Sequence, residues 1–206
     1  HDYSTNEPTM DGTASLTFPL AYYQEQGKAY DEGMTDRNVY DQGGIVRGDT
    51  AVKKMCLVFT SYDRIDGYNA ITQALMKHGV KGNFFFTGKF ISKYPDLVRQ
   101  LVAAGHYVGS HSYGHFLYCS WSDRSRTLVS KKKFDKDIDK SFAQLSQFGL
   151  NKQNAQFFMP PFEYYNSTIS AWARDKGLRL VNLTPGILTC YDYTYPGIKD
   201  GKYRDS

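Results

Sequence analysis

The chain has 206 residues, of which 41% are hydrophobic and 22% are charged, and this size and composition are typical of one globular domain. Its mean hydropathy of -0.53 and the lack of an apolar run near the ~20 residues that cross a bilayer exclude a membrane span. The net charge is +4, and the one concentrated basic run, residues 131–133, is followed by Asp135, Asp137 and Asp139. That pattern is typical of a solvated helix face, so we expect no nucleic-acid partner.

Two segments of the chain differ in character. Residues 1–50 are rich in Gly, Asp, Asn, Tyr and Thr without a sustained period, and we expect an irregular N-terminal arm or cap with little regular structure. Residues 51–206 form the second predicted unit. Apolar, β-branched and aromatic runs predict strands over residues 55–60, 82–87, 107–109, 156–159 and 178–183. Helical spacing of apolar residues predicts helices over residues 68–78, 94–104, 132–148 and 168–176, each followed by a glycine that can end a helix.

Strands that alternate with helices of this length form βαβ units, and therefore an α/β fold with a mainly parallel sheet, open or closed into a barrel. In both architectures functional residues lie at the carboxyl ends of the strands. The segments that follow the predicted strands are therefore where site residues are expected.

Metal-ligating residue types follow two of these strands. Asp63 follows the first strand, and His111 and His115 follow the third. Two imidazoles and one carboxylate from a neighbouring strand can hold a divalent cation with open positions for water and substrate. Such an ion activates water or polarises a carbonyl. In the alternative, the two histidines are ordinary hydrogen-bonding residues and bind no ion.

Three segments between residues 53 and 185 carry recognisable motifs. Residues 105–115 read Gly-His-Tyr-Val-Gly-Ser-His-Ser-Tyr-Gly-His, residues 157–163 read Phe-Phe-Met-Pro-Pro-Phe-Glu, and residues 82–88 read Gly-Asn-Phe-Phe-Phe-Thr-Gly. They resemble the polysaccharide deacetylase domain (NodB homology, carbohydrate esterase family 4), whose motifs include Gly-His-x-x-Gly-x-His-Ser-x-x-His and Phe-Arg-Pro-Pro-Tyr-Gly. The resemblance implies a distorted (β/α)7-type barrel and hydrolysis of acetyl groups on carbohydrate. It also implies a divalent ion, in first place Zn²⁺, held by Asp63, His111 and His115.

The first strand end departs from this family's Thr-Phe-Asp-Asp motif. If Asp63 takes the place of the metal-binding Asp, Tyr62 stands where the family has its catalytic-base Asp, and Met159 where it has the Arg that pairs with this base. An Arg without its carboxylate would be a poorly compensated charge, so the joint loss indicates altered or absent base catalysis. In the other register Thr60 and Ser61 align with the two Asp, and a carboxylate of the following loop has to reach the ion.

Two further acidic residues could serve catalysis. Glu163 follows the Pro160-Pro161 turn and could act as a general base, or it could be a solvent-exposed loop residue. Asp66 could reach the ion from its loop, or it could cap the helix that begins near Tyr68.

Aromatic and proline residues near these loops suit a carbohydrate groove, because sugar rings stack on aromatic faces. Each of them could instead pack within a loop or the core. The expected substrate-contacting residues are Tyr113, Trp121, Pro160, Pro161, Phe162 and Tyr164. We expect His78 and His106, next to helix-ending glycines, to be structural.

Two hypotheses for function follow. The first is a metal-dependent hydrolase that removes acetyl groups from oligo- or polysaccharide, with activity that the altered base position could impair. The second is a non-catalytic carbohydrate-binding domain on the same fold. The family's last motif, Leu-x-x-x-x-His with the general acid, is not found before Ser206, so we expect a further C-terminal segment or a second chain to complete the fold. Further segments resemble a bacterial subgroup of these proteins, which implies a secreted or periplasmic protein.

Overall fold

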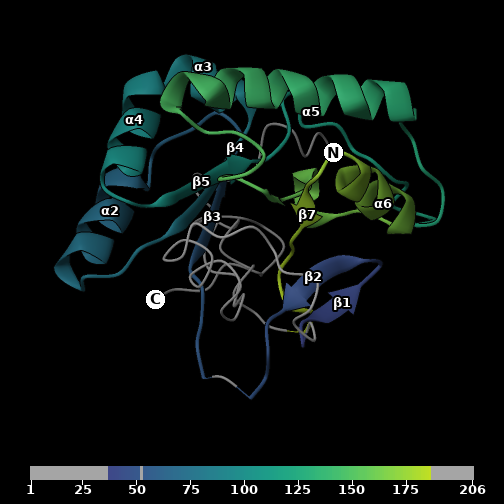
Figure 1. The fold of residues 1–206 in the computed structure, drawn as a ribbon, viewed down its shortest axis with the longest axis horizontal. Helices are drawn as coiled ribbons and strands as arrows, with labels where there is room; N and C mark the ends of the chain where they lie inside the picture. The colour runs from purple at the N-terminus through teal and green to yellow at the C-terminus, as the bar shows by residue number, and fades with distance from the viewer. Residues whose placement is uncertain (1–36, 52, 187–206) are drawn as a thin grey trace, which may run out of the picture.

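A five-stranded parallel sheet forms the centre of the molecule (Figure 1). The structure, a computed structural model, describes residues 37–51 and 53–186. The strands are, in their order across the sheet, β3 (Val58–Ser61), β4 (Asn83–Phe86), β5 (Tyr107–Ser110), β6 (Phe157–Phe158) and β7 (Arg179–Leu180). Ser61 lies opposite Phe86, and Phe86 lies opposite Ser110. The carboxyl ends of β3, β4 and β5 are therefore aligned, and the loops that follow these strands lie next to one another.

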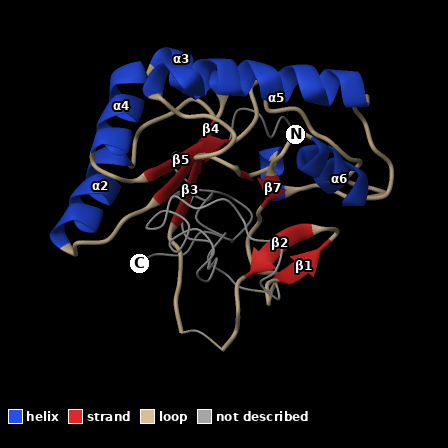
Figure 2. Ribbon diagram, in the orientation of Figure 1, coloured by secondary structure: helices blue, strands red, loops and turns tan. Residues whose placement is uncertain are grey.

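The helices follow one another in an arc around the sheet (Figure 2). They are α2 (Tyr68–Lys77), α3 (Gly88–Lys93), α4 (Pro95–Ala103), α5 (Lys131–Leu145) and α6 (Ser167–Asp175), with short 3-10 turns η2 (Ser146–Phe148) and η3 (Pro161–Glu163). Helix α3 was not expected from the sequence. It begins because the hydroxyl of Thr87 accepts a hydrogen bond from Phe90 N, and it ends before Pro95 opens α4. No helix in the described ranges is both long enough and apolar enough to cross a bilayer.

The side chains of β4 show how the sheet divides the core. Phe84 and Phe86 belong to the large core between the sheet and the helices, whereas Phe85 belongs to a smaller core on the opposite face. The alternation follows from the pleat of a strand. The Phe86 ring stacks on Phe90 of α3 with ring centroids 4.0 Å apart. Burial on both faces explains why these strands read as continuous apolar runs.

The expectation of an irregular arm is wrong for its last residues. Strands β1 (Val39–Asp41) and β2 (Gly44–Arg47) pair as an antiparallel hairpin, and Ile45 forms a parallel bridge with Val181 beyond β7. Gln42 and Gly43 have φ angles of 47° and 81°, the left-handed pair that a tight two-residue hairpin turn needs. Strands of three and four residues are too short to show a period in the sequence. Residues 1–36 of the expected arm lie outside the described residues, and the boundary near residue 50 stays a prediction.

The predicted α/β fold with a mainly parallel sheet, a distorted and incomplete (β/α)7-type barrel, is confirmed. Within the described residues the sheet is open, with β3 at one edge and the hairpin beside β7 at the other. The described cysteines, Cys56 and Cys119, are buried free thiols.

Candidate active site

The loop after β5 brings His111 and His115 together. His111 is fully buried, and its Nε2 lies 3.2 Å from Nε2 of His115. Its Nδ1 lies 2.9 Å from the carbonyl oxygen of Met159. Because a carbonyl oxygen only accepts hydrogen bonds, Nδ1 of His111 donates and Nε2 presents its lone pair toward His115. A backbone carbonyl in this position orients metal-ligating and proton-accepting imidazoles in the same way.

The turn before α6 places Glu163 beside this pair. Its Oε1 lies 3.9 Å from Nε2 of His111, and its side chain is 24% exposed. Phe162 and Glu163 have φ angles of 60° and 48°, and in the histidine loop Ser112 and His115 have φ angles of 68° and 52°. Across residues 37–51 and 53–186, only Gln42 is a further non-glycine residue with positive φ. Such conformations are costly for side chains with a Cβ and cluster at functional sites.

The structure does not bring Asp63 to the two histidines. The Asp63 carboxylate pairs with Lys89 Nζ of α3 at 2.8 Å, and the Asp66 carboxylate pairs with Arg64 at 2.9 Å. No group of three His, Cys, Asp or Glu side chains that could hold a metal ion occurs in the part of the chain that the structure describes. The expected three-ligand set therefore does not fit this arrangement.

The pairing of β3 explains where the loop carboxylates lie. The strand pairs with β4 through Ser61, so Thr60 and Ser61 occupy the strand end and Asp63 lies in the loop beyond it. This favours the register in which Thr60 and Ser61 align with the family's two Asp. Asp66 does not cap α2 either, because the residue at the N-cap is Gly67 and no side chain caps this helix.

Aromatic rings surround the histidines. The ring of His115 contacts two aromatic rings. Its centroid lies 5.0 Å from that of Tyr62 and 4.4 Å from that of Phe162. Trp121 stacks on Tyr164 at 4.4 Å and is 53% exposed. Exposed stacked rings of this kind can take the face of a sugar.

The remaining expected substrate residues have different surroundings. Pro160 and Pro161 are buried and shape the turn that carries Glu163. Tyr113 lies against α3, because a Cβ added to Gly88 would come within 2.1 Å of its ring. Lys89, which binds Asp63, was missed from the sequence together with the short helix that carries it.

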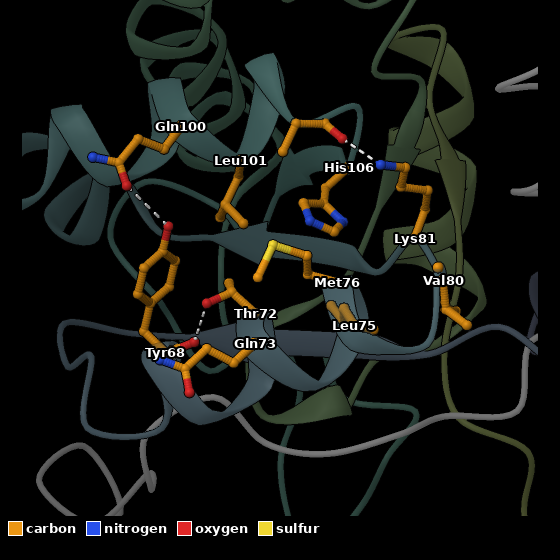
Figure 3. A pocket seen from close by; sticks show the side chains of 12 residues that line it. Tyr68, Thr72, Gln73, Leu75, Met76, Val80, Lys81, Gln100, Leu101 and His106 are labelled. Atoms are coloured by element: carbon orange, nitrogen blue, oxygen red, sulfur yellow. Dashed lines mark hydrogen bonds between the residues drawn. The ribbon is translucent and has the colours of Figure 1, made fainter.

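A cavity of about 360 Å³ lies between α2 and α4 (Figure 3). His106 lines it, and its Nδ1 accepts a hydrogen bond from Gly82 N at 3.0 Å. Since His106 precedes β5 and His111 follows it, the cavity lies at the opposite ends of the strands. His106 thus has the structural role that was expected.

The parallel sheet, with the histidine loop and the Glu163 turn at the carboxyl ends of its strands, indicates a polysaccharide deacetylase domain, and comparison with known proteins agrees. The model of the polysaccharide deacetylase family matches residues 47–181, and the chain belongs to this family.

Individual relatives are bacterial. The chain is 30% identical over 139 residues to an uncharacterized 30.6 kDa protein of Geobacillus stearothermophilus, a match that covers 66% of this chain and 48% of the relative. It is 23% identical over 175 residues to a peptidoglycan-N-acetylglucosamine deacetylase of Bacillus cereus, covering 80% of this chain and 58% of that one. The chain thus spans about half the length of these curated relatives.

Two solved structures from Bacillus anthracis share the fold. A family 4 carbohydrate esterase superposes with a TM-score of 0.58 at 21% identity, covering 76% of each chain. A family 4 pseudoenzyme superposes with a TM-score of 0.55 at 20% identity, covering 69% of this chain and 47% of that one.

Proposed function

We propose that this domain binds acetylated carbohydrate at the histidine pair and removes acetyl groups with Glu163 as general base. One observation carries the proposal: the Glu163 carboxylate is held 3.9 Å from Nε2 of the buried His111 by a turn with two successive positive φ angles. Such a backbone persists only where the surrounding structure enforces it. Membership of the polysaccharide deacetylase family supports the substrate class.

The chemistry needs one group that takes and returns a proton. A water molecule attacks the acetyl carbonyl carbon while the Glu163 carboxylate takes its proton. When the tetrahedral intermediate breaks down, Glu163 returns this proton to the departing nitrogen or oxygen of the sugar, and acetate is released. The stacked rings of Trp121 and Tyr164, next to Phe162, would hold the sugar beside this group.

A divalent cation, in first place Zn²⁺, is the cofactor that the family resemblance implies. The converging nitrogens of His111 and His115 fit two of its ligand positions, whereas Asp63, held by Lys89, does not fit the third. When bound, such an ion would polarise the acetyl carbonyl. We also propose that the protein acts outside the cytoplasm, because a relative is named for peptidoglycan, a cell-wall polymer.

A second candidate function is carbohydrate binding without hydrolysis. In the register that the pairing of β3 favours, Thr60 and Ser61 stand where the family motif has two Asp. The resemblance likewise places the buried Met159 at the position of the family's Arg. The fold likeness to a family 4 pseudoenzyme supports this candidate as well.

Acetate release from acetylated chitooligosaccharides and acetylated xylan, with and without added Zn²⁺, tests both candidates. We expect release by the wild type, and a loss of about 10²-fold or more in Glu163→Gln. Asp66→Asn, which removes an exposed loop carboxylate, is the matched control and should keep wild-type rates.

Binding measurements separate the outcomes. If no substrate releases acetate but calorimetry shows binding that Trp121→Ala abolishes, the second candidate holds and the hydrolase proposal is wrong. If neither release nor binding occurs, both candidates are wrong.

A further inference from the structure

A buried carboxylate lies beneath the histidine loop. Asp137 of α5 is 4% exposed, and its Oδ2 and Oδ1 accept hydrogen bonds from Tyr113 N at 3.0 Å and Gly114 N at 2.9 Å. Both donors lie between His111 and His115 in the chain. We infer that Asp137 is a positioning residue that fixes this loop so that the two imidazoles meet, an inference that rests on the proposed function of the loop.

The shape of the loop explains why it needs such support. Ser112 and His115 both have positive φ, which a free loop would relax. The Ser112 Oγ accepts a hydrogen bond from His115 N, and the Ser110 Oγ accepts one from Ser112 N. These bonds are internal to the segment, so they do not fix its place in the fold. The bonds to Asp137 connect it to a helix.

Carboxylate and loop fit each other closely. A Cβ added to Gly114 would lie 3.0 Å from Oδ1 of Asp137 and 2.8 Å from the Phe116 ring, so a side chain there would push the loop off the carboxylate. A second connection between α5 and β5 is the 2.8 Å contact between the hydroxyls of Ser141 and Ser110. Helix α5 is thus bonded to the end of β5 before His111 and to the loop after it.

The buried carboxylate of Asp137 is explained by its two hydrogen bonds to the histidine loop. Burial raises the pKa of the Asp137 carboxyl, and the N–H groups of Tyr113 and Gly114 oppose that shift. A neutral serine or asparagine at position 137 would have a lower desolvation cost than a carboxylate. Only a carboxylate, however, accepts from both adjacent N–H groups with its two oxygens, which holds them in one orientation.

Asp137→Asn tests the inference, because the amide keeps the volume but turns an NH₂ group toward one of the two donors. Nitrogen-15 NMR of the imidazole rings in the free protein reports the geometry directly. We expect the signals of His111 and His115 to shift while those of His78 and His106 stay. Asp135→Asn and Asp139→Asn, at carboxylates of the same helix that pair with Lys131 and Lys152, should leave all four unchanged.

Kinetics give a second readout. For acetate release we expect kcat of Asp137→Asn to fall about 10–100-fold, the usual effect of losing a residue that orients a site histidine, with KM largely unchanged. If Asp137→Asn does not fold, the same NMR and kinetic measurements are made on Asp137→Ser, which places no NH₂ group against the loop.

The two proposals fail separately. Imidazole signals identical to wild type in a folded Asp137 variant would overturn the positioning role whatever the activity. Shifted imidazole signals in a protein whose wild type releases no acetate would leave the positioning role intact and overturn only the hydrolase proposal.

Discussion

Gly88 is the position at which one methyl group should disturb the site through packing alone. It is the first residue of α3, its N donates to the carbonyl oxygen of Ser112, and a Cβ there would meet the Tyr113 ring at 2.1 Å. In Gly88→Ala, helix propensity favours alanine by at most about 1 kcal/mol. Overpacking against a ring costs typically about 1–3 kcal/mol. A separation of 2.1 Å is far shorter than any contact between real atoms, so the overpacking penalty exceeds the gain in helix propensity. We expect Gly88→Ala to lower the free energy of unfolding by about 1–2 kcal/mol.

Urea denaturation of a double-mutant cycle measures this effect. In a Tyr113→Ala background the obstructing ring is gone, so Gly88→Ala should become neutral or slightly stabilising, with a coupling energy of about 1–3 kcal/mol. The Gln144 side chain, 2.8 Å from the same Cβ, is flexible at its far end and should move at little cost. Equal effects of Gly88→Ala in both backgrounds would refute the assignment of the clash to Tyr113.

Three further predictions concern a helix cap, buried tyrosines and the Asp63 ion pair. The Asn166 side chain caps α6: it accepts a hydrogen bond from Ile169 N and donates one to Arg124 O. Asn166→Ala removes both bonds and should lower the free energy of unfolding by about 2 kcal/mol in urea titrations. Burial raises the pKa of the three buried tyrosines above the usual 10.0, so above pH 10 the unfolded chain loses protons that the folded one keeps. Stability measured by urea titration should therefore fall by about 1 kcal/mol for each tyrosine, about 3 kcal/mol together, from pH 10 to pH 11, and an unchanged stability over this range would contradict the prediction. These residues are Tyr107, Tyr118 and Tyr165. Lys89→Met frees the Asp63 carboxylate and should tighten Co²⁺ binding in an absorbance titration by at most about fivefold, because an exposed ion pair contributes about 1 kcal/mol or less. Lys93→Met is the matched control and should leave Co²⁺ binding unchanged, because Lys93 Nζ donates to the backbone carbonyl of Asp63 and not to its carboxylate.

The regular elements of the domain could be predicted because their sequence patterns are strong. The apolar run ending in Phe84, Phe85 and Phe86 became a strand buried on both faces. Helices α2, α4 and α6 end two residues before the expected glycines, whereas α5 ends at Leu145 and a 3-10 turn continues to the residue before the expected glycine. The hairpin around Gln42 could not be predicted, since its turn conformation carries only a weak signal in Gln-Gly.

The site was predictable only in part. His111 and His115 follow from a strand end and a motif, and the structure brings them together. The position of Asp63 depends on Lys89 in a helix that has no periodic signal, so its ion pair could not be foreseen. Phe162 and Glu163 adopt left-handed backbone without glycine, which no residue type announces, although the loop carboxylate itself was recognised as a candidate.

The bridge between Ile45 and Val181 has a consequence for biosynthesis. Asn182 N donates to Ile45 O at 2.9 Å, and the Thr184 hydroxyl donates to Val46 O at 2.6 Å. The hairpin thus completes its pairing with residues that lie up to 138 positions later in the chain. On the ribosome the hairpin emerges before these partners, so it must wait for all the intervening residues before these bonds can form. Until then the edge of β2 that pairs with Val181 is open to wrong partners, and a chaperone that covers extended segments would be most useful in this interval.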